Sequence, residues 1–117
     1  MKKTRQNNNR EPGSDEIGTD KALDVTEDAF LGGGLHLRQL KSGHRAGHDA
    51  MLLAAATPAQ PGNRVADLGA GVGAAGLAVA RRVSGIDLVL VEIDVTLAGL
   101  AGSNAALNAL AADVIVL

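Results

Sequence analysis

Cysteine, tryptophan and tyrosine are absent from the 117 residues, and Phe30 is the one aromatic side chain. The lack of cysteine excludes disulfide bonds and thiolate metal sites, and it suits a reducing compartment, so we expect a cytoplasmic protein. With one aromatic ring, a core has to be built from Ala, Val, Leu and Ile, and the apolar content of 46% is enough for it. The apolar runs are too short to span a bilayer, so we expect no membrane partner.

An excess of charge is also missing, because the formal net charge is only −2. That balance provides no overall attraction to nucleic acid. Residues 1–19 combine asparagine, glycine, proline and both signs of charge, with Ile17 the only bulky apolar side chain after Met1. Such a segment buries too little to offset its chain entropy, so we predict a disordered tail. Lys2-Lys3 is followed by polar residues, which is not the pattern of a secretory signal.

The stretch Arg64–Gly76 carries the clearest structural pattern in the chain. It begins with a short apolar run, meets an acid at Asp67, and breaks into glycines at positions 69, 71, 73 and 76. Small, helix-compatible residues follow up to Val83. This order predicts a buried strand over 64–68, a tight turn and a helix over 74–83. Glycines let the turn approach a ligand closely, and free N–H groups at the helix start point toward it.

A second acid stands where a nucleotide site needs one. The run Leu88–Val91 is strand-like and ends on Glu92, nineteen residues after Gly73. In nucleotide-binding βαβ units, a carboxylate near this spacing binds the ribose hydroxyls. Glu92 is therefore a candidate ribose ligand.

The glycines alone leave the ligand open. Gly71–Gly76 matches G-x-G-x-x-G, which is typical of dinucleotide binding, but glycine is abundant in this chain and a purely structural turn would look the same. The acid at Asp67 argues against a dinucleotide, because it would oppose a pyrophosphate on the helix N-terminus. A cationic amine or sulfonium would instead be attracted to that carboxylate.

The residues Asp67–Gly73, which read D-L-G-A-G-V-G, resemble the first motif of the class I S-adenosylmethionine-dependent methyltransferases, (D/E)-x-G-x-G-x-G. The resemblance implies a Rossmann-like fold, S-adenosyl-L-methionine as the cofactor, and a ribose-binding role for Glu92. The cofactor-binding residues that it implies in this part of the chain are Asp67, Gly69, Ala70, Gly71, Gly73, Glu92, Ile93 and Asp94.

Upstream of the motif, residues 30–40 predict a hairpin. Phe30-Leu31 precedes three glycines, and the following Leu35–Leu40 alternates apolar with polar side chains. A small basic cluster then follows, formed by Arg38, Lys41, His44 and Arg45. Such a cluster contacts RNA phosphates in some proteins and is merely solvated in others, and the sequence leaves both open.

Histidines 44 and 48 have the i,i+4 spacing of metal ligands on a helix. However, Gly43 and Gly47 make the segment a poor helix, and no third ligand is apparent. We therefore expect no metal site.

Asp49 precedes the helix-forming run Ala50–Ala56, which Thr57-Pro58 ends, so Asp49 is the predicted N-cap. The segment Gly43–Leu53 also resembles the loop and helix start that precede the first motif in adenine-N(6)-methyltransferases of the valine tRNA type. By that resemblance the loop closes over the methionine end of the cofactor, and the exocyclic amine of adenine in tRNA accepts the methyl group. The pocket residues that it implies are Arg45, His48 and Asp49.

Beyond Glu92, the pattern predicts a helix over Val95–Leu110 and a third strand over Asp113–Leu117. Asp94 is expected either to cap that helix, with Thr96 as the alternative cap, or to approach the adenine of the cofactor. Asn104 and Asn108 fall on one helical face, and we expect them to serve packing or capping.

Together these elements predict an α/β protein. It would be the first half of a doubly wound, Rossmann-like methyltransferase sheet with strand order 3-2-1, preceded by an N-terminal hairpin and helix. The expected divisions are a tail over 1–19, the hairpin and helix over 20–60, and a truncated S-adenosylmethionine-binding domain over 61–117.

The family's Asn-Pro-Pro-aromatic motif, which grips the target adenine, is absent from these residues, so no catalytic residue is predicted. We expect a truncated methyltransferase, with tRNA or another nucleic acid as partner, that is inactive alone. Its first strand would have an open edge, through which we expect self-association. The alternative is a non-catalytic remnant, or an NAD-type nucleotide-binding module, that needs a partner chain.

Overall fold

The computed structural model describes residues 24–43 and 45–117. The predicted disordered tail over 1–19 and the candidate ligand His44 therefore lie outside the described residues. Two compact units divide the chain, and residues 27–39 and 44–117 belong to the larger one. The smaller unit contributes residues 24–26 and 40–43 to the described part. Within it, the Lys41 backbone nitrogen donates to the Asp24 carbonyl at 2.9 Å.

Three parallel strands form the sheet of the larger unit: β4 (Arg64–Leu68), β5 (Asp87–Glu92) and β6 (Asp113–Val116). Their order is β4-β5-β6, with Leu68 opposite Val91 and Val91 opposite Ile115. The predicted α/β class and the strand order 3-2-1 are thus confirmed. Among the described residues, β4 pairs only with β5, so its other edge has no strand neighbour there.

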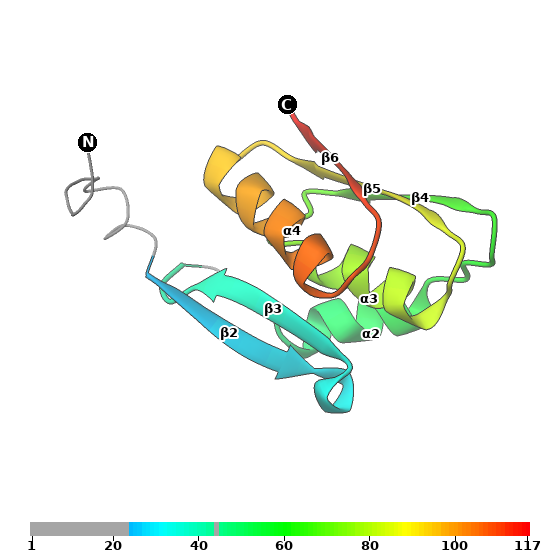
Figure 1. The fold of residues 1–117 in the computed structure, drawn as a ribbon, viewed down its shortest axis with the longest axis horizontal. Coiled ribbons are helices and arrows are strands. Elements are labelled where there is room, and N and C mark those ends of the chain that lie inside the picture. Colours follow the sequence, from blue (N-terminus) through cyan, green and yellow to red (C-terminus); the bar gives the residue numbers. More distant parts are fainter. Residues whose placement is uncertain (1–23, 44) are drawn as a thin grey trace. The chain divides into compact units, whose positions relative to one another are not determined.

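Helices α3 (Ala74–Arg82) and α4 (Val95–Leu107) lie on the same side of this sheet (Figure 1). Side chains on a strand alternate between the two faces, and Leu88 and Leu90 on the helical face are fully buried with Leu77 of α3. The opposite face is open, with Leu68 at 77% exposure at one end and the ion pair between Arg64 and Asp87 at the other. The core is therefore one-sided in this part of the chain.

The hairpin predicted near residue 30 is present. It consists of β2 (Val25–Phe30), a single 3₁₀ turn η1 (Leu31–Gly33) and β3 (Leu35–Leu40), and it forms a separate two-stranded sheet. In β3, Leu35 and Leu37 are completely buried and join the same core as Leu77. His36 and Arg38, which alternate with these leucines, are exposed, as the alternation in the sequence predicts.

Two predicted helix ends are wrong. Helix α2 (His48–Ala56) begins one residue before the predicted cap, Gly47 occupies the N-cap, and Asp49 lies inside the first turn without capping the helix. An acid in the first turn still interacts favourably with the helix dipole, so the composition there resembles that of a cap. Helix α4 ends at Leu107, earlier than predicted, because Asn108 caps it and Ala109 adopts a left-handed φ of 55°.

Candidate functional site

A cavity of about 610 Å³ opens at the carboxyl end of β4. One wall is the turn between β4 and α3, and the other is the segment that leads into α2. In an open parallel sheet, ligands bind in the crevice outside the carboxyl ends of the strands. The predicted site residues that line this cavity are Arg45, His48, Asp49, Asp67, Gly69, Ala70 and Gly71.

The turn after β4 is anchored to the neighbouring strand. The backbone nitrogens of Gly69 and Ala70 both donate to the Val91 carbonyl at 2.9 Å. Gly71 has a φ of 59°, and no heavy atom lies within 4 Å of where its Cβ would be. The backbone at Gly71 therefore faces open space, where a ligand can approach it without meeting a side chain.

Asp67 is a half-buried carboxylate at the base of the cavity. Its Oδ2 atom accepts a hydrogen bond from the Gly76 nitrogen at 2.9 Å, which ties the end of β4 to the first turn of α3. Burial raises the pKa of Asp67 above its usual value, the Gly76 N–H opposes this rise, and the charge of Glu92 adds to it. A cation in the cavity would stabilise the ionised form of Asp67 and so offset both the cost of its burial and the repulsion from Glu92.

Glu92 is buried, with only 8% of its surface exposed, and it does not line the cavity. Its Oε1 atom accepts from the Gly71 nitrogen at 2.8 Å, and Oε2 accepts from the Asp94 nitrogen at 2.8 Å. These two N–H groups lower the pKa of Glu92 despite its burial. The ribose-binding role stays a prediction, and the visible role of this carboxylate is to hold the glycine turn against the end of β5.

Three other predicted cofactor residues also lie off the cavity wall. Gly73 is buried, whereas Ile93 and Asp94 are exposed. Asp94 caps α4, because its Oδ1 atom accepts from the Leu97 nitrogen at 3.0 Å. Capping by Asp94 is thus confirmed, and its proposed approach to an adenine stays a prediction.

The second wall depends on residues that the motifs did not single out. Arg45 Nη2 donates to Asp28 Oδ2 at 2.7 Å, and the same oxygen accepts from Gln39 Nε2 at 3.0 Å. Gln39 is 2% exposed, and its Oε1 accepts from the Ala46 nitrogen at 2.7 Å. Gln39 occupies an inward position of the alternating strand β3, and a polar residue there is the one signal that marks it in the sequence.

Each described member of the predicted basic cluster faces an acid. Arg38 Nε lies 3.4 Å from Glu27 Oε1, and Lys41 Nζ lies 3.5 Å from Asp24 Oδ1. Arg45 pairs with Asp28 as described above. Such pairing reduces the positive potential around these side chains. An RNA-contacting role for this cluster stays a prediction.

The fold and the cavity together define a class of protein: a parallel α/β unit with a glycine-rich turn after the first strand of its sheet, beside an open cavity. Over residues 42–117 the sequence matches the Methyltransferase small domain family, and the chain belongs to that family. No curated protein matches the chain in sequence at a significant level. Among the described residues, no helix is long and apolar enough to cross a membrane.

Several solved structures share this fold. TYW2 of Pyrococcus horikoshii, solved with MeSAdo, is 20% identical with a TM-score of 0.66, over 81% of this chain and 36% of that one. The Pyrococcus abyssi tRNA (uracil-54, C5)-methyltransferase, solved with S-adenosyl-L-homocysteine, is 18% identical with a TM-score of 0.63, over 80% of this chain and 24% of that one.

A third neighbour is nearer in sequence. The 16S rRNA N2 G1207 methyltransferase of Thermus thermophilus, solved with AdoMet and guanosine, is 28% identical with a TM-score of 0.60. The alignment covers 76% of this chain and 26% of that protein. The chain therefore spans about a quarter to a third of the length of these neighbours.

Proposed function

We propose that this chain is the S-adenosyl-L-methionine-binding part of a methyltransferase that modifies the exocyclic amine of adenine in tRNA. The observation that carries the proposal is the position of Asp67, a half-buried carboxylate at the base of the cavity beside the glycine turn. Membership of the methyltransferase family and neighbours solved with S-adenosylmethionine or its demethylated product support it.

The charge around the turn favours this cofactor over a dinucleotide. Asp67 and Glu92 both lie beside the residues of the turn, and the charge of Glu92 contributes to the raised pKa of Asp67. A pyrophosphate placed there would add further negative charge close to two carboxylates. S-adenosylmethionine carries no phosphate, and its ammonium and sulfonium outnumber its single carboxylate, so placing the ammonium beside Asp67 would lower the electrostatic energy of the site.

Within this proposal, each wall of the cavity has its own task. Asp67 binds the ammonium of the cofactor, and the backbone at Gly69 and Gly71 lets the cofactor approach closely. Glu92, which lies behind the turn and not in the cavity wall, accepts the ribose hydroxyls with the lone pairs that its backbone bonds leave free. The residues on the α2 side close over the methionine end: Arg45, His48 and Asp49.

The remaining predicted contacts lie toward the adenine of the cofactor. Ala70 lines the cavity beside the turn. Gly73 lets the start of α3 pack closely, because an added Cβ there would crowd the neighbouring side chains. The exposed side chain of Ile93, at 72% exposure, provides an apolar surface near Asp94 for an adenine ring.

The acceptor is proposed from the substrates of the structural neighbours and from the segment Gly43–Leu53. One neighbour acts on tRNA and another on N2 of guanine in rRNA, which is an exocyclic amine of a purine. The resemblance of Gly43–Leu53 to the valine tRNA enzymes narrows the target to adenine. S-adenosylmethionine supplies an electrophilic methyl group when bound, and the contribution of this chain is to position it.

Calorimetric titration of the full chain with S-adenosylmethionine, S-adenosylhomocysteine and NAD tests the ligand class. We expect binding of the first two and none of the third, and tighter binding of NAD would overturn the proposal. The acceptor is tested on the whole protein by radioactive methyl transfer to unmodified tRNA, followed by nucleoside analysis. A label in N(6)-methyladenosine is expected, and a label in another nucleoside would refute the adenine assignment.

A further inference from the structure

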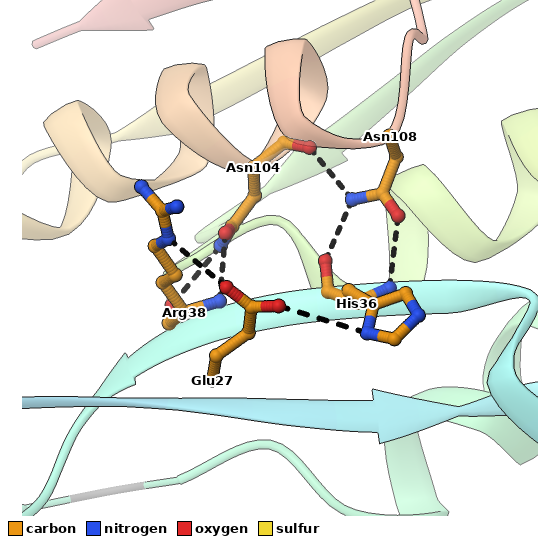
Figure 2. Close-up of polar contacts among 5 residues, drawn as sticks. All are labelled: Glu27, His36, Arg38, Asn104 and Asn108. Atoms are coloured by element: carbon orange, nitrogen blue, oxygen red, sulfur yellow. Dashed lines mark hydrogen bonds and ion pairs between the residues drawn. The ribbon is translucent and has the colours of Figure 1, made fainter.

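The buried side of α4 contains two asparagines with no contact to the cavity. Asn104 is completely buried and Asn108 is 6% exposed. Figure 2 shows both carboxamides facing one edge of β3, each paired with the backbone of a single residue of that strand. A buried amide without hydrogen-bond partners would destabilise the fold. The partners of these two carboxamides therefore indicate their structural role.

Each carboxamide pairs with the edge of β3 as a neighbouring strand would. Asn108 Oδ1 accepts from the His36 nitrogen at 2.8 Å, and its Nδ2 donates to the His36 carbonyl at 2.6 Å. Asn104 makes the same pair with Arg38, at 2.7 Å for the accepted bond and 3.1 Å for the donated one. The hairpin is therefore joined to α4 by four backbone-directed hydrogen bonds.

The spacing explains why two asparagines fit one strand edge. Four residues along a helix advance about 6 Å. Two residues along a strand advance about 6.7 Å, and their N–H and C=O groups point to the same side. Residues 104 and 108 of α4 therefore match residues 36 and 38 of β3.

The two asparagines differ in the acceptor that the second Nδ2 hydrogen reaches. Asn104 Nδ2 also donates to the Val72 carbonyl at 2.9 Å, whereas Asn108 Nδ2 donates to the Asn104 carbonyl of its own helix at 2.7 Å. Val72 is the residue between Gly71 and Gly73 of the turn, and it is 9% exposed. Of these two asparagines, Asn104 alone connects the hairpin to the turn that lines the cavity.

We propose that Asn104 is a positioning residue that couples the β2–β3 hairpin to the glycine turn and thereby sets cofactor affinity. One amide group satisfies the Arg38 backbone and the Val72 carbonyl, so displacing the hairpin removes a restraint on the turn. The effect on affinity rests on the proposed function, because it requires that the cavity bind S-adenosylmethionine.

The next residue of the same strand reaches the opposite wall. Gln39 accepts from the Ala46 nitrogen at 2.7 Å and donates to Asp28, which also receives Arg45. Arg38 and Gln39 thus connect β3 to both sides of the cavity. The hairpin acts as a common support for the two walls.

The chain offers a matched control for the test. Asn104→Ala and Asn108→Ala each remove two hydrogen bonds to the edge of β3, but only the first also releases the Val72 carbonyl. Two measurements are made on each full-length variant: hydrogen exchange of the Gly71 and Gly73 amides, and affinity for S-adenosylhomocysteine at equal folded fraction. Exchange of amides within α3 reports global unfolding and serves as the internal reference.

We expect Asn104→Ala to speed exchange at Gly71 and Gly73 at least 10-fold relative to Asn108→Ala, and to weaken S-adenosylhomocysteine binding about 10-fold more. Equal effects of the two variants would overturn the coupling. If Asn104→Ala does not fold, Asn104→Ser replaces it, because a hydroxyl is too short to bond both partners. If the wild type fails to bind S-adenosylhomocysteine, the proposed function fails, while the exchange comparison still decides whether Asn104 orders the turn.

Discussion

The backbone nitrogen of Gly76 lies 2.9 Å from Oδ2 of Asp67, and this contact leaves no room for a side chain at residue 76. A Cβ there would lie 2.6 Å from Leu90 Cδ2 and 3.1 Å from the same Asp67 oxygen. The close approach of α3 to the sheet is therefore what brings the Asp67 carboxylate under the start of the helix. Gly76, the fourth glycine of the stretch Arg64–Gly76, therefore serves packing and not ligand access.

Gly76→Ala should destabilise the protein even though alanine favours a helix. Forcing a methyl group into this contact costs about 1–3 kcal/mol, which exceeds the gain of about 1 kcal/mol in helix propensity. Gly99→Ala is the control, because Gly99 lies in the exposed interior of α4 and an added Cβ meets nothing within 4 Å. Chemical denaturation should show a lower free energy of unfolding for Gly76→Ala and a higher one for Gly99→Ala. A stable Gly76→Ala protein would contradict the packing account.

Asp67→Asn should separate stability from binding. Folding raises the pKa of Asp67 above its ordinary value of 3.8, so the folded state binds this proton more tightly than the unfolded state. The resulting contribution to the free energy of unfolding is present at low pH and is lost as pH rises through the folded pKa. At pH 7 the neutral asparagine should therefore leave the free energy of unfolding unchanged or raise it. Affinity for S-adenosylmethionine should fall roughly 10- to 100-fold, because a charge-assisted bond worth about 1.5–3 kcal/mol is lost. Denaturation and calorimetry measure the two effects separately, and unchanged affinity would remove Asp67 from the site.

Glu92→Ala should weaken S-adenosylmethionine binding more than Asp94→Ala. The first variant removes the proposed ribose ligand and also the acceptor of the Gly71 N–H. The second removes a helix cap, which is worth about 1 kcal/mol. We expect a loss of about 10- to 100-fold for Glu92→Ala and less than 10-fold for Asp94→Ala. Calorimetry gives the ranking, and the reverse order would refute the assignment of Glu92.

The stabilising effect of Glu92 should depend on pH in the acid range. The pKa of Glu92 in the folded protein lies below its ordinary value of 4.5. Its contribution to the free energy of unfolding is therefore complete above pH 4.5 and is lost as pH falls through the folded pKa. The difference in unfolding free energy between wild type and Glu92→Gln should therefore be constant from pH 7 to about 5 and shrink at lower pH. Urea denaturation across this range measures it. A difference that grows on acidification would contradict the assigned direction.

The open edge of β4 should promote association of the 117-residue chain. Among the described residues this edge has no strand neighbour, and Ala66 lies exposed at its centre. A lysine on an edge strand opposes pairing with another copy, so Ala66→Lys should shift the chain toward the monomer. Light scattering as a function of concentration measures the shift. A wild-type chain that is monomeric at high concentration would refute the prediction of self-association.

Local sequence pattern was sufficient for the order of elements and for the position of the glycine-rich turn. Strand β4 begins and ends as predicted, and Asp94 caps α4, because apolar runs and caps act over a few neighbouring residues. Glycines in the turn are likewise needed for local backbone geometry. The same locality explains the error at Asp49, since an acid in the first turn and an acid at the N-cap have similar sequence contexts.

Tertiary structure alone decided how the cavity is supported. Asn104 pairs with Arg38 across 66 positions, and Asn108 pairs with His36 across 72. Arg45 meets Asp28 across 17. Spacing along the chain carries no signal for such partners, because they meet only once β3 packs beside α4. From the sequence Glu92 could be assigned to a ribose, but its two backbone partners appear only when β5 is placed beside the glycine turn.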